Sequence, residues 1–192
     1  MTYGTLQTRS YAFNRSLILN ELERTLSAVN HPRIAAAQEM ILDANRVFVM
    51  GAGRSGLALK MAAMRLMHLG LTVHIAGEVT SPAIGLGDLL LVASGSGTTA
   101  GPVHAAEVAL KAGARVLALT AASDSKLGRL AQCVVVIPAA AKQDHDGTIS
   151  EQYAGALFEQ SLLLILDSMF QTMWYERGES AESLWRRHAN LE

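Results

Sequence analysis

Short runs of aliphatic residues alternate with helical periodicity through most of the chain. The runs predict five strands, at Arg46–Met50, Thr72–Ile75, Asp88–Ala93, Arg115–Thr120 and Cys133–Ile137. Between them, apolar residues recur at three- and four-residue spacing, which predicts helices at Ser55–Leu69, Pro102–Ala112 and Lys126–Ala131. Continuous aliphatic strands separated by helices are typical of a parallel sheet that is covered on both faces. The pattern therefore predicts a doubly wound α/β sandwich, in which ligands bind at the carboxyl ends of the strands.

Two helices are predicted before this core. Asn14 is the expected cap of the first, which ends near Asn30-His31-Pro32 and whose apolar positions are Leu17, Ile18, Leu22, Leu26 and Val29. The second covers about Arg33–Ala44. The first of these two helices is amphipathic, so its apolar face is a candidate for a subunit interface as well as for the core.

Two further helices are predicted after the last strand. A loop at Ala139–Ser150 leads into a long helix at about Glu151–Tyr175, and a short helix follows around Ser180–Arg187. A chain of 192 residues fits one domain. We expect a helical segment at about 14–44, an α/β core at about 46–175 and a tail at 176–192.

Composition narrows the possible functions. Hydrophobic residues make up 50% of the chain and charged residues 17%, a surplus of apolar surface that favours an oligomer. The net charge of -1 provides no basic field, so nucleic acid is not an expected partner. Cys133, the single cysteine, precedes three valines and is expected to be a small buried residue. Residues 1–10 contain no apolar core of a secretory signal and no apolar run approaches about 20 residues, so we expect a cytoplasmic protein and no membrane.

A loop rich in hydroxyl groups follows the third predicted strand. Ser94-Gly95-Ser96-Gly97-Thr98-Thr99 supplies hydroxyls and backbone N–H groups at the start of a helix, a setting that suits a phosphate monoester. The loop contains no lysine, which argues against a nucleoside triphosphate. A small phosphorylated molecule such as a sugar phosphate is the expected ligand, and the alternative is a polar turn that binds nothing.

A second glycine-rich turn, Gly51-Ala52-Gly53-Arg54-Ser55-Gly56, follows the first predicted strand. Its glycine spacing matches that of dinucleotide-binding folds, but such a site needs an acidic residue at the end of the next strand, and Glu78 is the sole candidate. Contact of Arg54 and Ser55 with a small polyol or its phosphate is the preferred interpretation, and the alternative is a tight turn with a solvated arginine.

Taken together, several segments resemble the sugar isomerase (SIS) domains, and among these the 6-phospho-3-hexuloisomerase family. They are the turn at 51–56, the loop at 94–97, Met64-Arg65-Leu66-Met67-His68-Leu69-Gly70, Gly77-Glu78-Val79-Thr80-Ser81-Pro82-Ala83-Ile84 and Arg187-His188-Ala189-Asn190-Leu191-Glu192. The resemblance runs in order from the first strand to the last residue and implies a flavodoxin-like SIS fold. The chain departs from the family pattern at Thr98, where a glutamate is usual, and at Ala156, where a threonine is usual.

The resemblance implies interconversion of D-arabino-hex-3-ulose 6-phosphate and D-fructose 6-phosphate through a cis-enediol, in the ribulose monophosphate pathway of formaldehyde fixation. One carboxylate is sufficient to move the proton between C3 and C2, without a metal or an organic cofactor. Glu159 is the expected base, because it lies in the apolar run from Gly155 to Leu166 where a solvated glutamate is less expected. An exposed helix glutamate is the alternative.

Further site residues are also implied by the resemblance. His68 is a second candidate catalytic residue, able in such isomerases to reach a neighbouring subunit's site; a histidine that caps its helix is the alternative. His188 is expected to cover the ligand. The phosphate would be held by the hydroxyl and glycine residues Ser55, Ser94, Gly95, Ser96, Gly97, Thr98 and Thr99, and Arg54 would bind oxygens nearer the chemistry. A homotetramer and a functional link to the hexulose-phosphate synthase are expected.

Other possibilities remain open. Gln143-Asp144-His145-Asp146-Gly147 and the pair His104 and Glu107 have residue types that bind metals, but neither has a supporting set of ligands. No G-x-S-x-G motif places a nucleophilic serine. The rival functions are another aldose–ketose isomerase of sugar phosphates and a sensor that binds a sugar phosphate without turnover.

Overall fold

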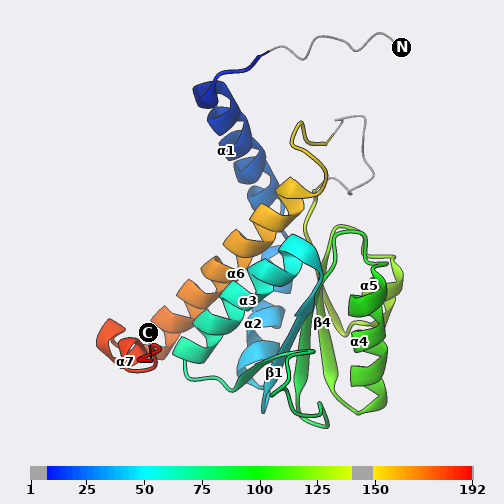
Figure 1. Cartoon of the computed structure of the whole chain (residues 1–192), viewed down its shortest axis with the longest axis vertical. Coiled ribbons are helices and arrows are strands. Elements are labelled where there is room, and N and C mark those ends of the chain that lie inside the picture. Colours follow the sequence, from blue (N-terminus) through cyan, green and yellow to red (C-terminus); the bar gives the residue numbers. More distant parts are fainter. Residues whose placement is uncertain (1–7, 140–148, 192) are drawn as a thin grey trace.

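The protein is described by a computed structural model that covers residues 8–139 and 149–191. Its centre is a five-stranded parallel sheet in the order β2-β1-β3-β4-β5 (Figure 1). The strands are β1 (Val47–Gly51), β2 (Val73–Ile75), β3 (Leu89–Ala93), β4 (Arg115–Thr120) and β5 (Cys133–Val136). The predicted doubly wound α/β fold is confirmed.

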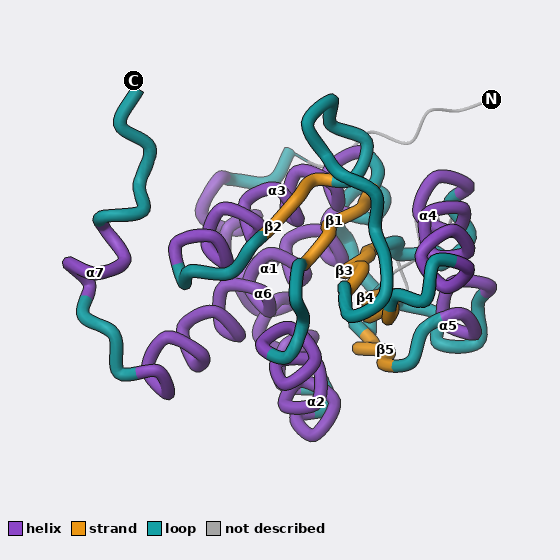
Figure 2. Tube along the Cα trace, turned by 90° about the horizontal axis from the view of Figure 1, so that it is seen from below, coloured by secondary structure: helices purple, strands orange, loops and turns teal. Residues whose placement is uncertain are grey.

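Helices cover both faces of this sheet (Figure 2). One face carries α3 (Gly53–His68) and α6 (Ala156–Arg177), together with the first two helices, α1 (Tyr11–Ser27) and α2 (His31–Leu42). The other carries α4 (Ala100–Lys111) and α5 (Lys126–Leu130). Helices α3 and α6 begin near the same edge of the sheet and run side by side towards α7 (Ala181–Trp185) (Figure 1).

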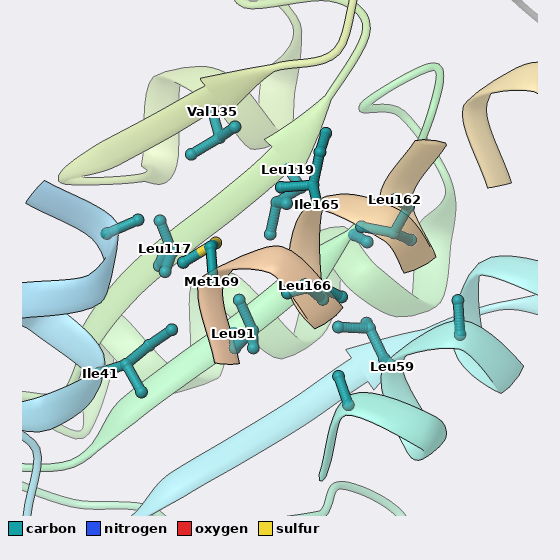
Figure 3. Close-up of a cluster of buried hydrophobic side chains, with 14 of the residues drawn as sticks. Ile41, Leu59, Leu91, Leu117, Leu119, Val135, Leu162, Ile165, Leu166 and Met169 are labelled. Atoms are coloured by element: carbon teal, nitrogen blue, oxygen red, sulfur yellow. The ribbon is translucent and has the colours of Figure 1, made fainter. Parts of the chain in front are cut away.

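Alternate residues of each strand enter two separate cores. Leu91 and Leu119 point towards the side of α2, α3 and α6, where they meet Leu59, Leu162 and Met169 among others (Figure 3), and Val49 belongs to the same core. Phe48, Leu90 and Val92 point towards α4 and α5. Burial of each such side chain stabilises the fold by about 1.5–3 kcal/mol. Cys133 is 3% exposed and belongs to the first core, as predicted.

The strands lie within one residue of their predicted bounds, whereas several helices begin elsewhere. Helix α1 starts at Tyr11 because the Ser10 side chain accepts a hydrogen bond from the backbone N–H of Phe13, so the predicted cap at Asn14 is wrong. Asn30 caps α2 in the same way, which starts this helix at His31 rather than Arg33. Helix α3 starts at Gly53, two residues before the predicted Ser55.

The long C-terminal helix also departs from its prediction. It begins at Ala156 rather than Glu151 and continues to Arg177, where Gly178 ends it in a left-handed conformation with φ 63°. Ala154 has a φ of 53°, which a helix cannot contain, and residues 150–152 are held by α1 instead. Among the described residues, no helix is both long and apolar enough to cross a membrane.

Candidate active site

The chain changes direction between two neighbouring strands at the centre of the sheet. Strands β1 and β3 are hydrogen-bonded to each other, yet β1 leads into α3 on one face and β3 leads into α4 on the other. The segments that follow these strands therefore diverge from the carboxyl ends of β1 and β3, each towards a different face of the sheet. Ligands of doubly wound sheets bind at such a switch point.

The turn after β1 places two of the predicted site residues at this point. A Cβ on Gly56 would lie 2.6 Å from the carbonyl oxygen of Gly51, so only glycine allows the close approach of strand and helix. Gly53 has a φ of 57° and turns the chain into α3. As a result Ser55 is buried in the first turn of the helix, whereas Arg54 extends outward and is 59% exposed.

The serine loop lies directly after β3. The hydroxyls of Ser94 and Thr99 are hydrogen-bonded to each other at 2.9 Å, which closes the loop at its base. At its tip the Ser96 hydroxyl accepts from the backbone N–H and the hydroxyl of Thr98, at 3.3 and 3.0 Å. Ser96, Thr98 and Thr99 are exposed, so their polar groups are accessible to a ligand.

Helix α6 brings a carboxylate to the same place. A Cβ on Gly95 would lie 3.4 Å from the ring of Phe158, so the loop backbone packs against the residue that precedes Glu159. Glu159 is 7% exposed, which confirms that it is buried, and its Oε2 lies 3.1 Å from Nη1 of Arg54. The structure thus brings Glu159, Arg54 and the serine loop together from three separate elements.

The helices that begin at this site differ from the others in their capping. Among the described helices, α3, α4 and α6 have no side-chain cap, at Ala52, Thr99 and Gly155 respectively. In α1, α2, α5 and α7 a serine or asparagine side chain accepts a hydrogen bond from the first turn. First-turn N–H groups without a cap are donors for an anionic ligand, and the helix dipoles favour negative charge there.

The two predicted histidines are together, but at the opposite end of α3. Arg54 and His68 are separated by 14 residues of helix, or about 21 Å. His68 is 2% exposed and stacks on His188 at 3.8 Å between ring centroids, and Trp185 stacks on His188 at 4.4 Å. Burial lowers the pKa of His68, and the nearby His188 and Arg65 lower it further. Within one chain these histidines do not meet Glu159.

The weaker sequence candidates have other partners. Glu78 pairs with Lys60 at 2.6 Å, and Glu107 pairs with Lys126 at 2.8 Å. Among the described residues, no group of three potential metal ligands comes together. The segment Gln143–Gly147 lies outside the described residues.

Sequence reasoning missed a polar cluster near the start of α6. Glu21 of α1 is 6% exposed and accepts hydrogen bonds from Ser150, Glu151 and Gln152. Burial is the largest single influence on the pKa of Glu21 and raises it. The hydrogen bonds together outweigh burial, so the pKa lies below its ordinary value. Glu21 lies next to the apolar positions of the first predicted helix. A charged residue on a face expected to be buried was therefore the one sequence signal for this cluster.

Comparison with known proteins identifies relatives along most of the chain. The sequence profile of the SIS domain matches residues 40–163, which include the turn, the serine loop and Glu159. The 3-hexulose-6-phosphate isomerase of Mycobacterium gastri is 57% identical over 93% of this chain and 90% of its own length. The Bacillus subtilis protein of the same name is 38% identical, over 91% and 95% respectively.

A solved structure shows the same fold. A hypothetical protein of Methanococcus jannaschii superposes with a TM-score of 0.80, over 93% of this chain and 99% of its own. Its sequence is 23% identical, so the likeness concerns the arrangement of the elements.

Proposed function

The chain belongs to the SIS domain family, and we propose that it interconverts D-arabino-hex-3-ulose 6-phosphate and D-fructose 6-phosphate. The main support is the convergence of the serine loop, Arg54 and Glu159 at the switch point of the sheet, in a chain 57% identical to a 3-hexulose-6-phosphate isomerase. An isomerase of this kind belongs to formaldehyde fixation by ribulose monophosphate.

The proposed reaction is a proton transfer through a cis-enediol. The carboxylate of Glu159 takes the proton from C3 of fructose 6-phosphate, and the carbonyl oxygen at C2 acquires a proton as the double bond forms between C2 and C3. The O–H at C3 then gives up its proton, and Glu159 returns a proton to C2, which produces the 3-ketose. General acid–base chemistry completes this cycle without a metal or an organic cofactor.

Arg54 is suited to stabilise the enediol oxygens. Its guanidinium contacts Glu159 at 3.1 Å and is exposed on its other side, so a sugar oxygen near the carboxylate would lie within reach of both. A positive group at this point favours the negative charge that develops on those oxygens.

The phosphate would bind at the serine loop. Ser55, Ser94, Ser96, Thr98 and Thr99 supply the hydroxyls, and Gly95 and Gly97 let the loop pack closely against Phe158 and Ser125. The uncapped starts of α3 and α4 add backbone N–H donors. Thr98, in place of the glutamate usual in the family, keeps a carboxylate away from the phosphate.

His68 and His188 would serve the active site of a neighbouring subunit in a homotetramer. This proposal accounts for their distance from Glu159 within one chain. His68, held neutral by burial, would exchange protons with the enediol oxygens, and His188 would cover the ligand. The cytoplasmic location and the functional link to the hexulose-phosphate synthase stay predictions of the sequence.

Proton NMR of fructose 6-phosphate in heavy water tests the reaction. Exchange at C3 together with the appearance of a 3-ketose is the expected result. Exchange at C1 would instead identify an aldose–ketose isomerase. Binding without exchange at any carbon would contradict turnover of this substrate and favour a sugar-phosphate sensor.

Glu159→Gln tests the role of the base. The substitution keeps the shape of the side chain but removes the proton acceptor, so we expect at least a 100-fold fall in C3 exchange while fructose 6-phosphate still binds. Glu176→Gln, an exposed position on the same helix, is the matched control and should retain full activity. Wild-type exchange in Glu159→Gln would exclude this residue as the base.

A further inference from the structure

The most deeply buried positions of α1 are polar, and one of them is a carboxylate. Within this fully described helix, the buried residues are Glu21 and Thr25. Glu21 accepts three hydrogen bonds from one short segment: from the Ser150 hydroxyl at 2.7 Å, the Glu151 backbone N–H at 2.8 Å and Nε2 of Gln152 at 2.9 Å. Burying a carboxylate costs free energy unless its oxygens are hydrogen-bonded. Hydrogen bonds to an ionised carboxylate are stronger than those between neutral groups, so these three bonds hold the segment firmly.

Additional contacts tie the same segment to α1 and to the residues just before this helix. The Arg24 guanidinium donates to the carbonyl oxygen of Ile149 at 2.7 Å, and Arg9 pairs with Glu151 at 2.6 Å. The backbone N–H of Gln152 donates to the Ser150 hydroxyl at 3.1 Å, which closes a small turn around the carboxylate. Residues 149–152 are therefore fixed to α1 through side chains and backbone together.

This segment leads directly into the first turn of α6. The N–H of Ala156 donates to the carbonyl of Tyr153, and the N–H of Glu159 donates to the carbonyl of Gly155. No side chain caps the start of α6 at Gly155. The direction in which the chain enters this helix is thus set by the residues before it, and Figure 1 shows α1 beside the point where α6 begins.

We propose that Glu21 is a positioning residue for Glu159, because its three hydrogen bonds fix the segment from which the first turn of α6 starts. The proposal rests on the proposed isomerase function. Glu21 does not contact the substrate site itself; it acts through Ser150 and Gln152. Catalytic geometry is sensitive to such support, since a displacement of about 1 Å at a reacting group lowers the rate by about 100-fold.

Glu21→Gln is the principal test. The amide has nearly the shape of the carboxylate, but its NH₂ would face donors from Ser150 or Gln152, so the segment would lose its fixed position. We expect kcat to fall about 10- to 100-fold with little change in KM, because the phosphate loop follows β3 and is independent of α1. Glu23→Gln is the matched control, since Glu23 lies on the same helix, is exposed and accepts from Ser27 alone among the described residues.

A second readout separates positioning from a loss of folded protein. In heavy water, the ratio of C3 exchange to net isomerisation reports how the enediol partitions, and it does not depend on the amount of active enzyme. A displaced base changes this ratio in Glu21→Gln, whereas partial unfolding lowers both rates equally. Ser150→Ala, which removes one small donor, should change the ratio in the same direction and is available if Glu21→Gln does not fold.

Each failure has its own signature. If Glu21→Gln and Ser150→Ala keep the wild-type kcat and exchange ratio while Glu159→Gln is inactive, the positioning role is wrong and the base assignment stands. An unchanged ratio with a lowered rate would also overturn the proposal, since it indicates a structural role alone. If Glu159→Gln keeps full exchange, the proposed base itself is wrong.

Discussion

A methyl group at position 97 would have no room. Gly97 has a φ of 63°, and a Cβ there would overlap the side chain of Ser125, which caps α5 by accepting from the N–H of Gly128. Gly97→Ala thus combines left-handed strain of about 1–2 kcal/mol with loss of a cap worth about 1 kcal/mol. We expect the melting temperature to fall by roughly 4–12 °C, measured by circular dichroism.

Gly53→Ala is the matched comparison at the other glycine turn. Gly53 also has a positive φ, of 57°, but apart from its chain neighbours and the backbone of its own helix no described atom lies within 4 Å of the position that its Cβ would occupy. Its substitution should cost the strain alone, about 1–2 kcal/mol. Equal losses of stability in the two variants would show that the contact with Ser125 has no influence.

At the scale of the elements, stacked histidines hold the C-terminal tail against the end of α3. His188 stacks on His68, and Arg187 donates to the carbonyl oxygen of His68 at 2.8 Å. Because the folded protein lowers the pKa of His68 below its ordinary value of 6.5, the unfolded chain binds more protons as the pH falls. This contribution to stability is complete above about pH 6.5 and is lost below it.

We therefore expect the melting temperature to fall by a few degrees between pH 7.5 and pH 5.5, and to fall less in His68→Gln. Glu21 and Asp88 also have lowered pKa values, but these start from 4.5 and 3.8, so their contributions are lost at lower pH. His31→Gln, at an exposed position, is the control. An identical pH response of wild type and His68→Gln would contradict the role of this stack.

The elements also show what sequence could and could not predict. The strands were predicted within one residue because most are short aliphatic runs, a local property, and the central strands β3 and β4 are buried almost throughout. The start of α6 was not, because residues 150–152, which precede it, donate hydrogen bonds to Glu21, more than 120 residues away in sequence. The burial of Glu159 could be predicted from its apolar neighbours in the sequence, whereas its contact with Arg54 depends on the packing of α3 against α6.

At the scale of the whole molecule, α3 presents an apolar face that the described residues of the chain leave exposed. Leu57, Met61 and Met64 lie one or two turns apart and are 61%, 50% and 50% exposed. The same helix begins at the proposed active site and ends at His68. Two copies paired antiparallel along α3 would bring His68 of one chain to the Arg54 end of the other, as a two-fold interface requires.

Subunit mixing tests this arrangement. Glu159→Gln and His68→Gln are each expected to be inactive, but a site in a mixed oligomer would be complete when Glu159 and His68 come from different chains. Random exchange of subunits should restore activity in about a quarter of the sites. If the mixture stays inactive after exchange, shown by the mixing of two labels, His68 does not act in a neighbouring subunit's site.

The absence of a side-chain cap at the N-termini of α3, α4 and α6 has a consequence for the lifetime of the protein. Three helices converge there with first-turn donors that no side chain caps, so the fold gives up stability at the place where a phosphorylated sugar would supply the missing acceptors. A ligand present at 100 times its dissociation constant adds about 2.7 kcal/mol to the stability of the folded state. The loaded enzyme would then resist proteolysis better than the empty one, and its abundance would follow the supply of its own substrate.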